Sequence, residues 1–329
     1  MTESSDVLVE TKNLSKIFGR GESALIAVNE INLQIKRNEI VGLVGESGSG
    51  KSTLGKLIVG LQDKSAGEVF YAGHQMPSRY GAADFKQYAD QVQMIFQDPY
   101  GSLNPRMTVE EIVGEGLRLK GDVTQGEIKK RVQRSLEQVG LSAEFFSRYP
   151  HEFSGGQRQR IGIARALIVN PQFIVCDEPI SALDVSVQAQ VVNLLKELQR
   201  EMGLSLLFIA HDLSMVRYIS DRILVMYRGR IVESGSCEQV FHQPKHPYTQ
   251  ELITANPVAD PIIERQRREV DEMNTCTLPH TVTNRPSQGC LFTDRCPYVM
   301  EKCYKSNEAF YSMQADIEQH RAACYRVTD

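Results

Sequence analysis

Three short runs of apolar residues interrupt the otherwise mixed pattern of this chain. They cover residues 40–45, 173–176 and 204–210. A continuous apolar run of this length is typical of a parallel strand covered on both faces, because none of its positions meets water. Between the second and third runs, apolar residues recur at helical spacing over 187–202, which predicts the crossover helix between two parallel strands. The pattern therefore predicts a parallel α/β core.

Helical spacing predominates from Gln97 to Asn170, which predicts a mainly helical insert. One apolar stripe in the insert consists of Ile128, Val132, Leu136 and Val139. Basic residues lie beside this stripe, and we interpret them as a solvated helix face: Lys129, Lys130, Arg131 and Arg134. Further on, residues 223–235 predict a hairpin that turns at Arg228 and Gly229 and closes the core.

The composition narrows the possible classes of protein. With 329 residues, 41% of them hydrophobic and 24% charged, the chain is long enough for one large domain and a smaller one. Its net charge of -4 argues against a dedicated nucleic-acid binder, which usually carries a basic excess. The N-terminal sequence MTESSDVLVE lacks the pattern of a secretory signal, and no apolar run is long enough to span a bilayer. We expect a soluble chain, or one that docks on a membrane through partners.

A glycine-rich loop follows the first apolar run and precedes a predicted helix from Ser52 to Leu61. The residues that fit the phosphate-loop pattern and continue into the helix are Gly45, Glu46, Ser47, Gly48, Ser49, Gly50, Lys51, Ser52 and Thr53. Glycines let backbone N–H groups turn inward around phosphates, helped by the N-terminal end of the helix. Lys51 is predicted to hold the β- and γ-phosphates, and Ser52 to ligate Mg²⁺. A plain glycine turn is the alternative, and the strand before the loop argues against it.

Two carboxylates, Asp177 and Glu178, end the second apolar run. They place negative charge where Mg²⁺ and an attacking water would lie. Asp177 is therefore the candidate metal ligand, and Glu178 the candidate group that polarises the water. The alternative is a solvated strand end, since an acidic pair after four apolar residues also arises by chance.

A second anion-binding helix start is predicted far from the first in sequence. It consists of Ser154, Gly155, Gly156 and Gln157, before a predicted helix over 158–168. This run resembles the signature motif of the ABC ATPases, with Phe153 in place of the commoner Leu. The resemblance implies that two subunits enclose two ATP molecules head to tail, each site pairing one phosphate loop with the other subunit's signature motif. Ser154 and Gly156 would then contact the γ-phosphate held by the partner.

Four further positions match ABC motifs in order. Gln97 resembles the glutamine that senses Mg²⁺ and the membrane partner, and Asp184 ends a Ser-Ala-Leu-Asp segment that resembles the loop communicating between subunits. His211 resembles the switch histidine that contacts the γ-phosphate, and Phe18 lies where the family stacks an aromatic ring on adenine. Taken singly, His211 is equally a structural histidine, and Phe18 is more often a core aromatic. The order and spacing of the whole set favour the functional assignments.

The resemblance covers about the first 240 residues. It implies an α/β P-loop NTPase of ABC type, with a parallel core sheet, an antiparallel β subdomain and a helical subdomain. Within 1–240, the core is expected over about 1–96 and 171–240, and the helical subdomain over about 97–170. ATP and Mg²⁺ are the implied cofactors. The implied catalytic residues are Glu178, His211 and Gln97, and the implied Mg²⁺ ligands are Ser52, Gln97 and Asp177.

The tail indicates a subfamily. His246-Pro247-Tyr248-Thr249, followed by Leu252, resembles the C-terminal extension of ATPase subunits from oligopeptide, dipeptide and nickel importers. Gln157 favours the subunit type conventionally called F, and an ordinary proline loop is the alternative for the tail. ABC ATPases that act on nucleic acid form the competing class. They predict a long coiled-coil insertion, two nucleotide units in one chain or a basic surface, and the sequence has none of these.

The implied function is ATP-driven import of di- or oligopeptides, with nickel or another small solute as the alternative cargo. The implied partners are a homologous second ATPase subunit in a heterodimer, two transmembrane permease subunits and, indirectly, a periplasmic or extracellular solute-binding protein. No nucleic-acid partner is expected. The expected location is peripheral, on the cytoplasmic side of the inner (plasma) membrane.

Four cysteines lie in the expected C-terminal extension, residues 241–329: Cys290, Cys296, Cys303 and Cys324. In a cytosolic chain such a cluster suggests a metal before disulfides. The spacing lacks the paired C-x2-C of most structural zinc sites, and four thiolates suit either Zn²⁺ or an iron–sulfur cluster. The importer resemblance favours a [4Fe–4S] cluster, followed by zinc and then by unligated thiols.

Overall fold

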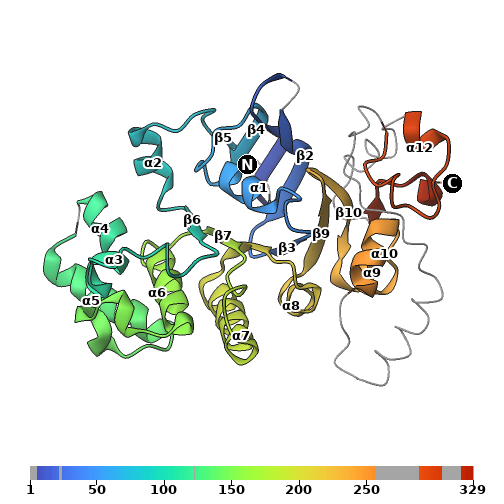
Figure 1. Ribbon diagram of the computed structural model, residues 1–329. Coiled ribbons are helices and arrows are strands. Elements are labelled where there is room, and N and C mark those ends of the chain that lie inside the picture. Colours follow the sequence, from blue (N-terminus) through green and yellow to red (C-terminus); the bar gives the residue numbers. More distant parts are fainter. Residues whose placement is uncertain (1–5, 22–23, 122, 256–288, 306–319, 329) are drawn as a thin grey trace.

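In this computed structural model, the described residues form two sheets and several groups of helices (Figure 1). The structure describes residues 6–21, 24–121, 123–255, 289–305 and 320–328. The larger sheet has seven strands in the order β11-β10-β9-β3-β8-β7-β6. Their bounds are β3 (Ile40–Val44), β6 (Val92–Ile95), β7 (Phe173–Asp177), β8 (Ser205–Ile209), β9 (Arg222–Tyr227), β10 (Arg230–Ser236) and β11 (Arg321–Ala322).

The centre of this sheet is parallel. The five strands from β9 to β6 run in one direction, and β10 and β11 are antiparallel at one edge. Every residue of β3, β7 and β8 is buried. This confirms the parallel strands predicted from the three apolar runs, because strands covered on both faces need no polar positions.

A smaller antiparallel sheet covers one face of the core. Its strands are β2 (Leu25–Lys36), β1 (Val7–Phe18), β4 (Ala66–Tyr71) and β5 (His74–Gln75), in that order. Helix α1 (Lys51–Ile58) contacts both sheets, since Leu54 belongs to the same buried cluster as Leu33 of β2 and Val175 of β7. The helix that begins at the phosphate loop is thus held on two sides by apolar packing.

Helices α7 (Val185–Met202) and α8 (Leu213–Ile219) belong to a second buried cluster with residues of the large sheet. Val191, Leu195 and Leu198 are the buried side of α7. This helix connects β7 to β8 and confirms the predicted crossover helix. The β9–β10 hairpin is also confirmed: it turns at Arg228 (φ 44) and Gly229 (φ 88), the two left-handed residues that a tight hairpin turn requires.

The helical insert lies at one end of the molecule (Figure 1). It contains α3 (Val109–Val113), α4 (Glu115–Lys120), α5 (Gln125–Gln138) and α6 (Gly155–Leu167), with short 3-10 helices at Ala143–Ser147 and Pro150–Glu152. The predicted stripe of Ile128, Val132 and Leu136 is buried in α5, and the basic residues beside it are exposed. A short helix before β6, α2 (Ala82–Tyr88), was not predicted; none of its residues is buried, so it carries no clear apolar stripe.

The C-terminal helices lie at the opposite end of the molecule from the insert (Figure 1). Those within the described residues are α9 (Cys237–His242), α10 (Pro247–Thr254), α12 (Lys302–Lys305) and α14 (Tyr325–Thr328). The short strand β11 pairs with β10, so Arg321 and Ala322 extend the large sheet by one strand. This part of the chain therefore contributes a strand to the same sheet as the nucleotide core.

Candidate nucleotide site

The phosphate loop joins β3 to α1 and passes very close to other backbone segments. A Cβ atom on Gly45 would lie 2.1 Å from the carbonyl oxygen of Met226, and one on Gly50 would lie 2.1 Å from that of Ala27. Both glycines also have positive φ values, 153° and 106°. Only glycine satisfies both the conformation and the close approach at these two positions.

Lys51 lies inside the loop. Its Nζ atom donates hydrogen bonds to the carbonyl oxygens of Gly45 at 2.7 Å and Glu46 at 2.9 Å, and only 4% of the residue is exposed. Burial lowers the pKa of the ammonium group, and the carboxylates of Glu178 and Asp177 oppose that change. The lysine is positioned where phosphate oxygens approach a loop of this kind.

Ser52 and Asp177 meet although they are far apart in sequence. Ser52 Oγ donates a hydrogen bond of 2.6 Å to Asp177 Oδ1 at the carboxyl end of β7. Burial raises the pKa of the Asp177 carboxyl, and the hydrogen bond from Ser52 opposes that change. A hydroxyl and a carboxylate side by side are oxygen donors of the kind that Mg²⁺ prefers. The predicted Mg²⁺ ligands Ser52 and Asp177 therefore form a donor set that fits the ion.

The three predicted catalytic residues are brought together beside this pair. Gln97 Nε2 donates a hydrogen bond of 2.9 Å to Glu178 Oε2, and His211 Nδ1 lies 3.6 Å from the same oxygen. The Glu178 side chain is 15% exposed, whereas that of His211 is 61% exposed. His211 is thus not a buried structural histidine. Glu178 itself follows β7 with a φ of 44°, an uncommon value for a residue with a side chain.

The predicted signature motif begins helix α6. Ser154 caps the helix: its Oγ accepts from the N–H of Gln157, and its own N–H donates to the side-chain oxygen of Gln157. A Cβ on Gly156 would lie 2.4 Å from a methyl group of Val187 in α7. Gly155 and Gly156 are partly exposed, and Ser154 is exposed. Within the described ranges, the hydrogen bonds of these four residues stay within the start of α6, and none reaches the phosphate loop of the same chain.

Three further residues that were predicted to contact the nucleotide or the partner subunit lie on other parts of the fold. Phe18, the last residue of β1, is 38% exposed, with Lys16 Nζ 5.0 Å from its ring centre, so it is not a core aromatic. Asp184 is the residue before α7, and its side chain is exposed. Thr53 follows Ser52 in α1 and is half-buried.

Comparison with known families identifies this arrangement. Residues 28–181 match the family described as ABC transporter, and residues 232–303 match the one described as Oligopeptide/dipeptide transporter, C-terminal region. The oligopeptide transport ATP-binding protein OppF of Streptococcus pyogenes is 48% identical over 318 residues, which cover 96% of this chain and 99% of the relative. The chain belongs to the ABC transporter family.

Other relatives and solved structures agree. AmiF of Streptococcus pneumoniae, also named an oligopeptide transport ATP-binding protein, is 53% identical over 80% of this chain and 86% of its own length. The ATP-binding cassette MJ0796, solved as a post-hydrolysis dimer bound to ADP and Pi, superimposes with a TM-score of 0.64 at 33% identity, covering 70% of this chain and 99% of that one. For cbiO1 from Clostridium perfringens the TM-score is 0.65 at 25% identity, covering 82% of this chain and all of the other. This chain is an ATP hydrolase with the P-loop fold of ABC ATPases, built from mixed sheets and helices.

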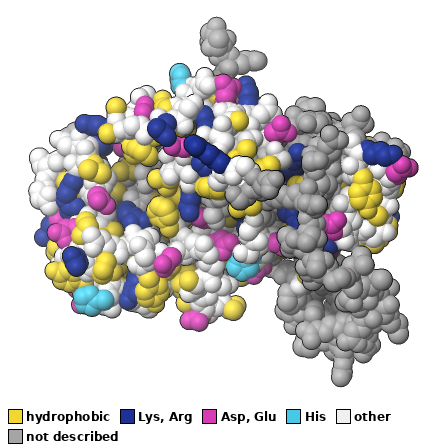
Figure 2. Space-filling view, turned by 45° about the horizontal axis from the view of Figure 1, so that its top comes forward, with side chains coloured by type: hydrophobic (Ala, Val, Ile, Leu, Met, Phe, Trp, Pro, Cys, Tyr) yellow, Lys and Arg dark blue, Asp and Glu magenta, His cyan; other side chains and the backbone are white. Residues whose placement is uncertain are grey.

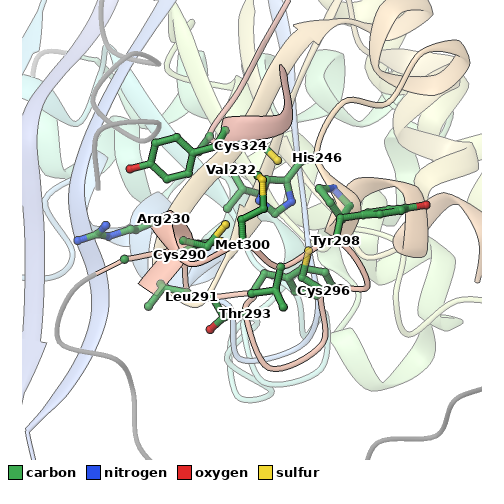
Figure 3. A pocket seen from close by; sticks show the side chains of 17 residues that line it. Arg230, Val232, His246, Cys290, Leu291, Thr293, Cys296, Tyr298, Met300 and Cys324 are labelled. Carbon is green, nitrogen blue, oxygen red and sulfur yellow. The ribbon is translucent and has the colours of Figure 1, made fainter. Parts of the chain in front are cut away.

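The four C-terminal cysteines require a correction. Cys290, Cys296, Cys303 and Cys324 all line one pocket (Figure 3). In the described parts of the chain, however, no group of three or more His, Cys, Asp or Glu side chains is arranged to hold a metal ion. This finding overturns the predicted [4Fe–4S] cluster, and it gives no support to the zinc alternative.

The surroundings of the thiols give the physical reason. The pocket is lined largely by apolar side chains, among them Val232, Phe292 and Met300. Burial there raises the pKa of the Cys290 thiol to about 11 and also raises that of Cys324. Metal ligation displaces the thiol protons, and burial makes that loss less favourable here. The cysteine spacing alone carried no information about this burial.

Two residues beside the phosphate loop were not predicted. Tyr248 Oη accepts a hydrogen bond of 2.9 Å from the backbone N–H of Glu46, and Arg295 Nη1 lies 2.9 Å from Glu46 Oε1. The His-Pro-Tyr-Thr turn drew attention to Tyr248 only as a subfamily feature. No local pattern marks Arg295, because its partners are distant in sequence.

Proposed function

We propose that this chain is the ATPase subunit of a binding-protein-dependent ABC importer, and that it couples ATP binding and hydrolysis to uptake of di- or oligopeptides. The observation that carries the proposal is the similarity to proteins named oligopeptide transport ATP-binding proteins, which extends over almost the whole chain of OppF. The match at residues 232–303 supports the same class, since it lies outside the ABC transporter match.

Transport by the assembled complex tests this proposal. Vesicles containing the complete transporter should accumulate a labelled tripeptide when ATP is supplied on the side of the ATPase subunits. Lys51→Ala should abolish accumulation, whereas Lys130→Ala, on the exposed face of α5, should leave it unchanged. Transport of a nickel chelate with no competition from peptides would refute the peptide cargo.

The phosphate loop supplies the ATP-binding groups in this proposal. Backbone N–H groups of this loop surround the phosphates, and Lys51 neutralises charge on the β- and γ-phosphates. Phe18 stacks on adenine, where its π face offers contact area without a directional hydrogen bond. The exposed position of Phe18 at the end of β1 supports this assignment.

Ser52, Asp177 and Gln97 are the residues that would hold Mg²⁺. When bound, Mg²⁺ neutralises the charge that develops on the phosphate oxygens. The 2.6 Å contact of Ser52 with Asp177 supports the first two ligands. Gln97 contacts Glu178 instead of this pair, so the proposed role of Gln97 as a ligand needs its amide to turn from Glu178 toward Ser52.

Glu178 acts on the attacking water. Its carboxylate accepts a proton or orients the water for in-line attack, and Gln97 and His211 border it on two sides. His211 is exposed enough for its ring to reach the γ-phosphate while Nδ1 remains near Glu178. The convergence of these three side chains from separate segments supports the assignment.

Ser154, Gly155, Gly156 and Gln157 complete a nucleotide site in the partner subunit. Their exposure at the start of α6 supports an action in trans, as does the dimeric state in which MJ0796 was solved. Asp184 would lie at the same interface. We propose a heterodimer with a homologous second ATPase subunit, docked on two transmembrane permease subunits that receive cargo from a solute-binding protein.

ATP binding closes the dimer in this proposal and moves the helical segment 97–170 inward with the membrane subunits attached. The chain docks peripherally on the cytoplasmic side of the plasma membrane. In the ranges that the structure describes, no helix is both long and apolar enough to cross a bilayer. On the face shown in Figure 2, basic and acidic side chains are interspersed, and the net charge of -4 gives no support to a nucleic-acid partner.

We also propose that residues 241–329 form an extension distinct from the nucleotide domain of residues 1–240, with the cysteine-lined pocket as part of it. The described residues 289–305 and 320–328 lie together at one end of the molecule, which supports this division (Figure 1). The pairing of β11 with β10 keeps the extension attached to the large sheet.

A further inference from the structure

A buried phenol of the C-terminal extension contacts the phosphate loop. Tyr248 Oη accepts a hydrogen bond of 2.9 Å from the backbone N–H of Glu46, 202 positions earlier. Glu46 is the second residue of the phosphate loop, and its carbonyl oxygen accepts a hydrogen bond from Lys51. One loop residue is therefore linked on its N–H side to the extension and on its C=O side to the lysine.

The phenol is held firmly. Tyr248 is 1% exposed, and its ring centre lies 4.5 Å from that of Tyr227 and 5.6 Å from that of Phe292. Tyr227 ends β9, and Phe292 comes from the described segment 289–305, so the ring is clamped between the core and the extension. Burial raises the pKa of Tyr248 well above its usual range, which keeps the hydroxyl neutral.

Arg295 holds the side chain of the same loop residue. Its Nη1 lies 2.9 Å from Glu46 Oε1, while Nη2 forms an ion pair with Glu251 of α10. The guanidinium also lies over the ring of Phe292, 5.4 Å from its centre. These contacts link α10, the segment around Arg295 and the phosphate loop into one network. Burial acts to lower the pKa of Arg295, but the hydrogen bonds to both carboxylates and their charges outweigh it and raise the pKa, so the guanidinium stays charged.

We propose that Tyr248 and Arg295 are positioning residues for the phosphate loop, through which the C-terminal extension presets the affinity of this subunit for ATP. They touch neither the phosphates nor the water; they act through Glu46. A loop already held in its binding shape loses less conformational freedom when ATP arrives, so the extension raises affinity without adding a contact to the nucleotide. This inference rests on the proposed role of the phosphate loop.

Tyr248→Phe is the first test, because it removes only the hydroxyl and keeps the packed ring. We expect MgATP to bind the purified full-length chain about fivefold more weakly, the effect of losing one hydrogen bond. Tyr304→Phe is the matched control: it makes the same change at an exposed tyrosine of the extension and should leave the dissociation constant unchanged. Isothermal titration calorimetry measures both. Unchanged affinity in Tyr248→Phe overturns the proposal for this residue.

A kinetic readout separates positioning from general stability. In the assembled transporter, Tyr248→Phe should raise the KM for ATP and leave kcat at saturating ATP close to that of the wild type, because chemistry at Glu178 is not altered. A loss of kcat with unchanged KM would contradict the proposal. The thermal unfolding midpoint of Tyr248→Phe should stay close to that of the wild type. A variant whose affinity for ATP falls only because part of the chain is unfolded would also contradict the proposal.

Arg295→Gln tests the second residue independently. We expect about two- to fivefold weaker MgATP binding at low salt and a smaller effect at high salt, since the ion pair with Glu46 is partly exposed. Arg326→Gln is the control: this arginine is in the same extension and stacks on Tyr298. If Arg295 acts through Glu46, its substitution should have little further effect in a Glu46→Gln chain. Fully additive effects would instead mean that the guanidinium attracts the nucleotide directly, and would refute positioning.

Lys51→Ala separates this inference from the proposed function. If Lys51→Ala binds MgATP as tightly as the wild type, the assigned role of the phosphate loop fails. If Lys51→Ala loses binding while Tyr248→Phe and Arg295→Gln do not change it, only the positioning role fails.

Discussion

Glu178→Gln removes one negative charge from the site and almost nothing else. The amide has the shape of the carboxylate, and its oxygen can still accept the 2.9 Å hydrogen bond from Gln97. Glu178 is also largely shielded, with 15% of its side chain exposed, so solvent does not replace the lost group easily. We expect the fold and the MgATP affinity to be retained, while the proton acceptor for the attacking water is lost.

The expected loss in kcat is about 10²–10⁴-fold, the usual contribution of a positioned general base, which corresponds to roughly 3–5 kcal/mol of barrier. ATP should therefore bind and accumulate in a closed dimer that reopens slowly. The assay is steady-state phosphate release by the assembled transporter, combined with the amount of nucleotide retained after rapid gel filtration. Glu197→Gln, the same change on the exposed side of α7, is the control. Near-normal turnover by Glu178→Gln would refute the reasoning.

Three further predictions concern the trans site, the core and the pH dependence of stability. Ser154→Arg should impair hydrolysis mainly at the site whose phosphate loop belongs to the partner, measured by combining it with Lys51→Ala in either subunit; equal loss at both sites would contradict action in trans. Leu136→Ala, fully buried in α5, should lower the free energy of unfolding by about 2–5 kcal/mol in urea titrations without changing MgATP affinity; a loss below 1 kcal/mol would mean that the insert is loosely packed. Burial lowers the pKa of His246 to about 4, so the stability tied to its neutral form is present above about pH 6.5 and lost as pH falls toward 4. His246→Gln should flatten the dependence of the unfolding midpoint in that range, and an unchanged slope would contradict this.

The sheet and its crossover helix could be predicted because their signals are local. The apolar run that became β7 is buried at every position, and the spacing that predicted α7 gives Val191, Leu195 and Leu198 as its buried side. In each case, the buried positions of the element are apolar residues at a regular spacing along a short stretch of sequence. Helix α2 has no buried residue, so no periodic stripe marks it.

The nucleotide site was predictable for a different reason. Asp177 ends β7, and Lys51 and Ser52 begin α1 directly after the loop that follows β3; the carboxyl ends of parallel strands meet at one edge of the sheet. A prediction of the parallel strands therefore also predicts that the polar residues following them lie close together. The 2.6 Å contact between Ser52 and Asp177 agrees with this. The convergence of Gln97 on Glu178 needed the family resemblance, since Gln97 follows an edge strand with a weaker pattern.

The cysteine prediction failed because spacing does not describe surroundings. Four cysteines within a short stretch specify neither the directions of their side chains nor the polarity around them. In the fold they line one pocket with apolar neighbours, and Cys290 is held as a neutral thiol. A prediction of ligation needs the thiolate to be favoured as well as the sulfur to be near.

The contact between Tyr248 and Glu46 also could not be predicted from the sequence. A hydrogen bond across 202 positions has no periodicity to reveal it, because it depends on how α10 docks beside β9. Phe292, from the segment 289–305, packs against both Tyr227 and Tyr248 in the same cluster. The extension therefore gives the phosphate loop contacts that the loop's own sequence does not encode. An identical glycine-rich loop in an ABC ATPase without this tail should bind ATP with a different affinity, and grafting the tail contacts would be needed to restore it.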